Sequence, residues 1–173
     1  MFSETNFSVS RVLKAGIVAG LVLGIFQAVG VLVTTGPAHT LMPLRMIAAI
    51  ALGPAALDPA YSPLVAATVG LALHLTLSMA FALIFAALVP VSFETVTEIE
   101  LGMAFGFLAW IFNFYLVAPA LGWVWFAEQT SPLVQLAAHT IGFGAVVGWF
   151  RHHAWEMDEA TIDPEVHKLH ALN

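Results

Sequence analysis

Four stretches of this sequence are long enough to cross a bilayer and almost free of charge, with only Lys14 and Glu100 near their ends. A transmembrane helix needs about 20 mostly apolar residues. The rest of a 173-residue chain offers too little surface to bury four such helices in a soluble fold. We therefore predict an all-α integral membrane bundle of four transmembrane helices, at about residues 13–34, 63–88, 99–118 and 132–150.

Composition excludes several classes of function. The chain is 60% hydrophobic and 9% charged, and its net charge of -6 includes no basic patch that could bind nucleic acid. The absence of cysteine excludes disulfides, iron–sulfur clusters and thiolate metal sites within the chain. No nucleophile–base pair, zinc-protease helix or phosphate loop is present, so we do not expect an enzyme.

The basic residues predict the orientation. Lysine and arginine favour the cytoplasmic side of a membrane, and most of them lie in the terminal segments, residues 1–12 and 151–173, or at the start of the first span. An even number of spans places both termini on one side. We expect a multi-pass protein with both termini cytoplasmic and a retained first helix, because that helix is too long for a cleaved signal.

The first outer loop has a helical segment of its own. Pro43 can open a helix over residues 44–52, which Gly53-Pro54 would stop. The segment is too short to span a bilayer. We predict an interfacial or re-entrant helix there.

The spans form two similar hairpins. Ser62-Pro63-Leu64-Val65 precedes His74, and Ser131-Pro132-Leu133-Val134 precedes His139. Each of these helices follows a glycine-striped one, so we predict two tandem, parallel hairpin repeats. Small residues four apart allow close helix packing. The glycines expected at helix contacts are Gly16, Gly20, Gly24, Gly102, Gly106, Gly144 and Gly148.

Each span carries a strong hydrogen-bonding residue. An unpaired polar group in hydrocarbon costs several kcal/mol, so these residues should turn inward and meet. We expect His74 to bond Ser78 or Asn113, and His139 to bond Gln135 or Gln27. The bland interpretation is a packing network of Gln27, His74, Ser78, Asn113, Gln135 and His139.

Two sharper interpretations use the same histidines. His74 and His139 are candidate axial ligands of haem b or another porphyrin-type pigment in an electron-transfer subunit. They are alternatively part of a proton or metal transport path. The histidines near the C-terminus, by contrast, predict a solvated tail with no metal site; they are His152, His153, His167 and His170.

Three segments of the first half of the chain carry a family resemblance. They are the run from Pro43 to Ala48, the Gly53-Pro54 stop, and the run from Gly70 to His74 with Ser78 after it. They resemble small bacterial four-helix inner-membrane proteins of a family with no assigned function. The resemblance implies a bacterial inner (plasma) membrane. With short polar termini, it favours an accessory or structural subunit of a larger, energy-converting membrane complex, associated with other subunits or with itself.

Overall fold

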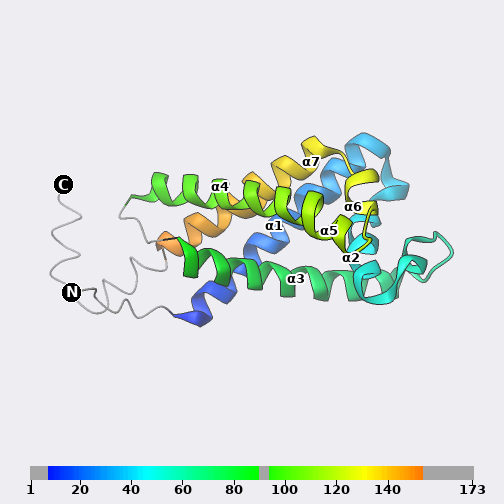
Figure 1. Ribbon diagram of the computed structural model, residues 1–173, viewed down its shortest axis with the longest axis horizontal. Helices are drawn as coiled ribbons and strands as arrows, with labels where there is room; N and C mark the ends of the chain where they lie inside the picture. The colour runs from blue at the N-terminus through cyan, green and yellow to red at the C-terminus, as the bar shows by residue number, and fades with distance from the viewer. Residues whose placement is uncertain (1–7, 90–93, 154–173) are drawn as a thin grey trace, which may run out of the picture.

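The computed structural model describes residues 8–89 and 94–153, and within them the chain is an all-α membrane bundle. The four helices long and apolar enough to cross a membrane are Val9–Thr35, Pro63–Leu88, Thr95–Ala120 and Pro132–His153. The predicted four-helix membrane fold is confirmed (Figure 1). His167, His170 and most of the expected tail lie outside the described residues.

The helix ends follow local sequence signals. The second span, α3 (Pro63–Leu88), begins after Ser62, whose hydroxyl accepts from the main-chain nitrogen of Val65. The first span, α1 (Val9–Thr35), ends at Gly36, whose φ of 90° suits a residue without a side chain. The second span has its predicted limits, and each of the other three is longer than predicted by up to four residues at one or both ends.

The third and fourth spans each contain a π-helical segment, which we did not predict. The third runs through α4 (Thr95–Phe112), η3 (Asn113–Val117) and α5 (Ala118–Ala120). The fourth runs through α7 (Pro132–Ala137) and η4 (Ala138–Ala145) to His153. A π turn pairs residues five apart and occurs often at functional sites.

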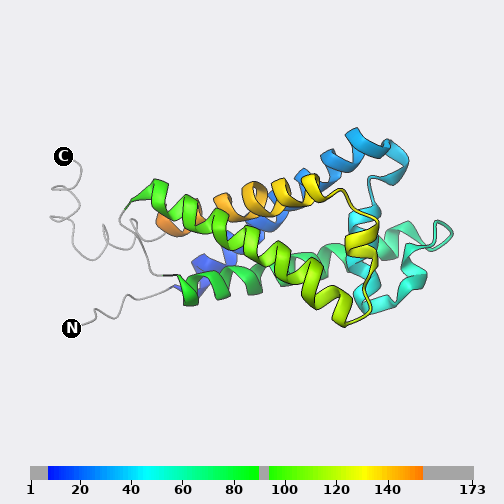
Figure 2. The ribbon, with the colours of Figure 1, turned by 45° about the horizontal axis from the view of Figure 1, so that its top comes forward.

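The spans pair as two consecutive hairpins, α1 with α3 and α4 with the fourth span (Figures 1 and 2). In the second hairpin the backbones touch: a Cβ on Gly102 would lie 2.2 Å from the main-chain oxygen of Gly144. In the first, a Cβ on Gly16 would lie 2.7 Å from the Cα of Met79. Gly24 is looser, with its nearest neighbour at 3.6 Å.

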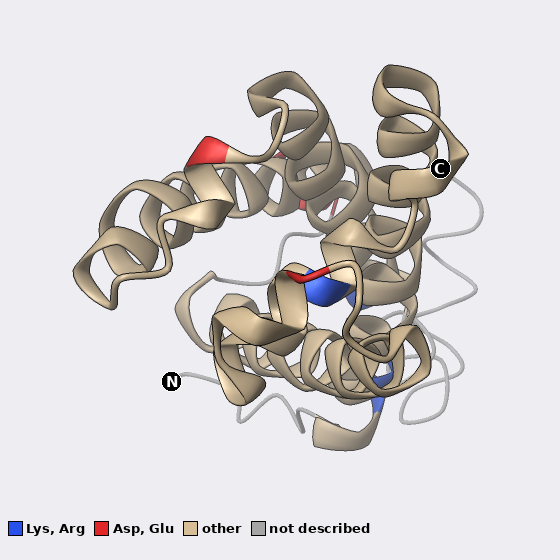
Figure 3. Cartoon of the chain, turned by 90° about the vertical axis from the view of Figure 1, so that its right-hand side faces the viewer, with Lys and Arg blue, Asp and Glu red and all other residues tan. Residues whose placement is uncertain are grey.

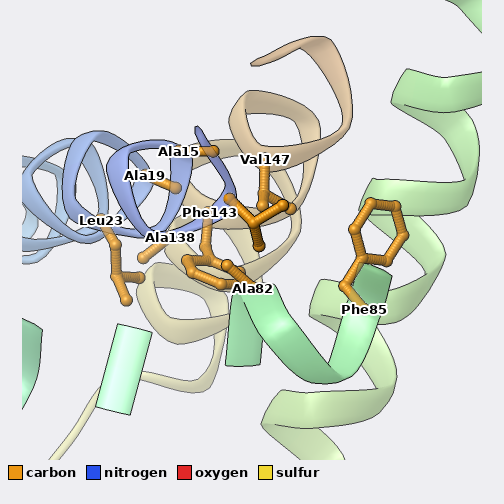
Figure 4. Close-up of a cluster of buried hydrophobic side chains, with 9 residues drawn as sticks. Ala15, Ala19, Leu23, Ala82, Phe85, Ala138, Phe143 and Val147 are labelled. Atoms are coloured by element: carbon orange, nitrogen blue, oxygen red, sulfur yellow. The ribbon is translucent and has the colours of Figure 1, made fainter. Parts of the chain in front are cut away.

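The two hairpins meet in an apolar core. All three helices contribute at least one alanine, and these small side chains pack among larger ones such as Phe85 and Phe143, so the helices approach closely (Figure 4). The buried members are Val12, Ala15, Ala19, Leu23, Ala82, Phe85, Ala138, Phe143 and Val147.

At the end of the bundle where α1 ends and α3 begins, α2 (Met42–Leu52) packs across α3 (Figure 1). This is the short helix that was predicted over residues 44–52, and it begins two residues earlier. Arg45 is buried and donates to the main-chain oxygens of Ala56, Asp58 and Tyr61 at 3.0, 2.8 and 3.0 Å. This guanidinium fixes the returning loop, on a face that is otherwise largely uncharged (Figure 3).

A buried ion pair lies at the other end of the bundle. Arg151 donates through Nε and Nη2 to Oε2 of Glu98, at 2.8 and 2.5 Å. Glu98 falls just before the third predicted span, which was expected to begin at about residue 99. It lies instead in the first turn of α4 and is fully buried, because the close approach of Gly148 brings the fourth span against it.

Candidate functional site

A cavity of about 290 Å³ lies between the membrane-spanning helices. All four spans contribute to its wall, and α2 adds Ile47 and Ile50. The wall is mainly apolar, with a few polar side chains that converge on the cavity. Pockets of this composition are the usual binding sites for small molecules.

The polar side chains of the wall are those that the sequence singled out. Gln27 comes from α1, His74 and Ser78 from α3, Asn113 from η3, and His139 from η4. Gln135 does not line the cavity, but its Oε1 accepts from Nε2 of Gln27 at 2.8 Å. Residues 108 positions apart in the sequence are therefore joined at the same level of the bundle.

His74 is held by the first hairpin. Its side chain is buried, and Nε2 donates to the main-chain oxygen of Gly20 at 2.8 Å. Glycine at position 20 is needed for this approach, because a Cβ there would lie 2.6 Å from Oγ of Ser78. The hydroxyl of Ser78 in turn donates to the main-chain oxygen of His74 at 2.8 Å.

His139 is held within its own helix. Nδ1 donates to the main-chain oxygen of Gln135 at 2.9 Å, and the ring of Phe114 meets the imidazole edge-on with centroids 5.4 Å apart. Asn113 repeats this arrangement: Nδ2 donates to the main-chain oxygen of Ala109 at 2.7 Å. In both π segments a side chain therefore bonds a carbonyl four residues earlier.

These contacts differ from the expected network. We expected side chains to bond one another, but both imidazoles and Asn113 bond main-chain carbonyls. A helical carbonyl has a second lone pair that can accept such a bond without disrupting the helix ladder. Among the six predicted residues, Gln27 and Gln135 alone form a side-chain pair in the part of the chain that the structure describes.

The hydrogen bonds fix the proton positions on the rings. A carbonyl oxygen only accepts, so Nε2 of His74 and Nδ1 of His139 carry the protons. In the neutral imidazoles, Nδ1 of His74 and Nε2 of His139 are consequently acceptors. Haem ligation through both Nε2 atoms would require breaking the bond from His74 to Gly20.

The cavity also has an aromatic wall that the sequence did not predict. Five rings from three spans and from the loop between the third and fourth spans line it: Phe81, Phe114, Trp123, Phe126 and Phe143. Phe114 and Phe126 pack edge-to-face with centroids 5.4 Å apart. Within residues 8–89 and 94–153, none of the lining side chains is an acid, a lysine or an arginine, and no group of three or more metal-binding side chains occurs.

Comparisons of the chain with protein-family models, curated proteins and solved structures found no match.

Proposed function

We propose that this multi-pass membrane protein binds a neutral, mostly apolar small molecule in the cavity between its four spans. One observation carries the proposal: polar side chains from every span, both histidines among them, line one apolar cavity at the level of the membrane. Polar groups inside a membrane are costly, and those that face a cavity usually serve a function. A molecule dissolved in the bilayer would reach this site without crossing water.

The two other uses of the histidines receive less support. Bis-imidazole ligation competes with the bond between His74 and Gly20, and a transport path would use titrating carboxylates that the described cavity wall does not contain. We therefore favour the proposed ligand over the two alternatives, haem b and a transported ion. A pigment would still be recognised by its visible absorption spectrum in the purified protein.

Binding can be tested with 4-octylbromobenzene, a neutral probe whose bromine quenches tryptophan fluorescence on contact. Trp123 lines the cavity, so the difference between wild type and Trp123→Phe isolates its signal. Ala109→Leu would fill the cavity, whereas Ala104→Leu adds the same side chain to an exposed position of the same helix. In nanodiscs, we expect saturable quenching of Trp123 in wild type and in Ala104→Leu. We expect no saturable quenching in Ala109→Leu.

Quenching that is linear in probe concentration and equal in all three proteins would overturn the proposal. It would mean that the bromine reaches Trp123 only from the surrounding lipid. Far-ultraviolet circular dichroism and the thermal midpoint of each variant report whether Ala109→Leu keeps the fold.

Association with a larger complex, location in a bacterial inner membrane, and cytoplasmic termini stay predictions from the sequence. The broad apolar faces of the spans suit lipid or a partner subunit equally, with Leu64, Leu88 and Leu133 each more than 70% exposed. Mild-detergent purification from the native membrane, followed by mass analysis of the copurifying chains, would test association. A chain recovered only as free monomer or homo-oligomer would contradict the accessory-subunit role.

A further inference from the structure

The hydrogen-bonding character of the cavity identifies the chemical class of its ligand. The inference rests on the proposed function, because it assumes that the cavity is a binding site. We propose that the ligand is a lipid-soluble phenol, including the hydroquinone type, whose hydroxyl group donates a hydrogen bond to the imidazole of His74 or His139.

Each of the two imidazoles has one nitrogen in use and one that can still accept a hydrogen bond. Their protonated nitrogens are used by the carbonyls of Gly20 and Gln135, and the second nitrogen of each ring makes no hydrogen bond within residues 8–89 and 94–153. Some side-chain nitrogen and oxygen atoms in these residues, such as Nε1 of Trp110, are fully buried and make no hydrogen bond. No imidazole nitrogen of His74 or His139 is among them. Both acceptor nitrogens are therefore open to a partner, and the rings that carry them line the cavity.

Asn113 adds a third acceptor. Only its Nδ2 can donate to the carbonyl of Ala109, so its orientation is fixed and Oδ1 remains as an acceptor. The two histidines and Asn113 thus offer three acceptors to one cavity, while each histidine has spent its N–H on the protein. A ligand that can only accept hydrogen bonds, such as a quinone or an ether, would leave these atoms unpaired.

The charge and shape of the wall narrow the class further. A cationic amine would also donate, but the described wall has no carboxylate to balance its charge in a low-dielectric site. The five aromatic rings suit a ligand that is itself aromatic, because rings prefer edge-to-face and offset contacts. A neutral aromatic hydroxyl with an apolar tail satisfies all three properties of the wall.

The test compares 4-octylphenol with 4-octylanisole, its methyl ether, as competitors of the brominated probe at Trp123. The two molecules share ring and tail, and the ether lacks the donor. With each concentration corrected for partition into empty nanodiscs, we expect the phenol to displace the probe with at least about tenfold higher affinity. Equal displacement by phenol and ether would overturn the inference while leaving the proposed function intact.

A variant locates the acceptor. His139→Asn retains a donor for the carbonyl of Gln135, as Asn113 does for that of Ala109, but the shorter side chain holds its Oδ1 acceptor closer to its own helix than Nε2 of the imidazole, and so out of reach of the same ligand. We expect about fivefold weaker binding of the phenol and unchanged binding of the ether. The exposed His39→Asn should change neither. Preference for the phenol that survives both His139→Asn and His74→Asn would overturn the assignment to the imidazoles. If wild type instead showed no saturable quenching of Trp123 by the brominated probe, the proposed function itself would be overturned.

Discussion

Arg151 reaches a single oxygen of Glu98 with two of its nitrogens and also donates through Nη1 to the main-chain oxygen of Val89 at 2.7 Å. Its guanidinium lies 4.2 Å from the ring centroid of Phe85. Side-chain exposure is 5% for Arg151 and 0% for Glu98. One cation therefore links the end of α3, the start of α4 and the end of the fourth span.

Removal of the Glu98 carboxylate should destabilise the bundle strongly. Glu98→Leu leaves the guanidinium of Arg151 buried beside an apolar group, which costs about 3–5 kcal/mol of unfolding free energy. Reversible unfolding in mixed micelles of increasing dodecyl sulfate measures this change. The exposed Glu100→Leu, half a turn away, serves as the control and should cost little.

The same pair should be replaceable as a unit. The double variant with Glu98→Leu and Arg151→Met removes both charges, and we expect it to recover most of the stability lost by Glu98→Leu alone. A double variant no more stable than the single one would show that the bonds of Arg151 to Val89 and Phe85 matter more than its bond to Glu98.

Substitution of glycine by alanine should change the stability differently at Gly102 of α4 and at Gly24 of α1. Gly102→Ala places a Cβ 2.2 Å from the oxygen of Gly144, which forces α4 and the fourth span apart and should cost about 1–3 kcal/mol. Gly24→Ala meets only a contact at 3.6 Å, so the better helix propensity of alanine should leave stability equal or slightly raised. The measurement is the change in unfolding free energy of each variant relative to wild type. Equal losses of stability in the two variants would contradict the close contact at Gly102.

Arg45 should control the loop that follows α2. Arg45→Met leaves the oxygens of Ala56, Asp58 and Tyr61 without their shared donor, and hydrogen bonds to a charged group contribute about 1.5–3 kcal/mol each. We expect faster amide hydrogen exchange over residues 55–61, detected by mass spectrometry. Leu52→Met, at a more exposed site of the same helix, should leave exchange unchanged. Protection that persists in Arg45→Met would refute this role.

The amide pair Gln27–Gln135 should show measurable coupling. A double-mutant cycle with leucine at each position isolates the bond, and hydrogen bonds between membrane helices average about 0.6 kcal/mol and reach about 1.7. The cycle of Gln27→Leu with the exposed Gln129→Leu provides the reference and should show no coupling. Zero coupling between positions 27 and 135 would mean that the pair contributes only through packing.

The sequence was most informative where structure depends on neighbours along the chain. The length of each apolar run predicted the spans, and Pro43 with Gly53 predicted α2, because turn and cap residues act locally. The glycine spacing predicted which helix faces could come together, although it did not distinguish the tight contact of Gly102 from the looser one of Gly24.

Partners between spans could not be predicted in the same way. The pairing of Glu98 with Arg151, 53 residues apart, depends on how far each helix rotates about its axis. The π segments at Asn113 and His139 change that rotation within a span, and no residue pattern announces them. Five of the six polar residues that the sequence singled out line the cavity, and His139 bonds the expected residue, Gln135, although through its main-chain oxygen. The sequence did not predict Gly20 as the partner of His74.

The uncharged wall of the cavity has an electrical consequence. Moving one elementary charge across a membrane potential of roughly 100 mV changes the free energy by about 2.3 kcal/mol. A neutral phenol that enters from the lipid and meets neutral imidazoles moves no charge through that field. Occupancy of this site would then be the same in an energised and a de-energised membrane, so the protein would report the amount of its ligand in the bilayer independently of the membrane voltage.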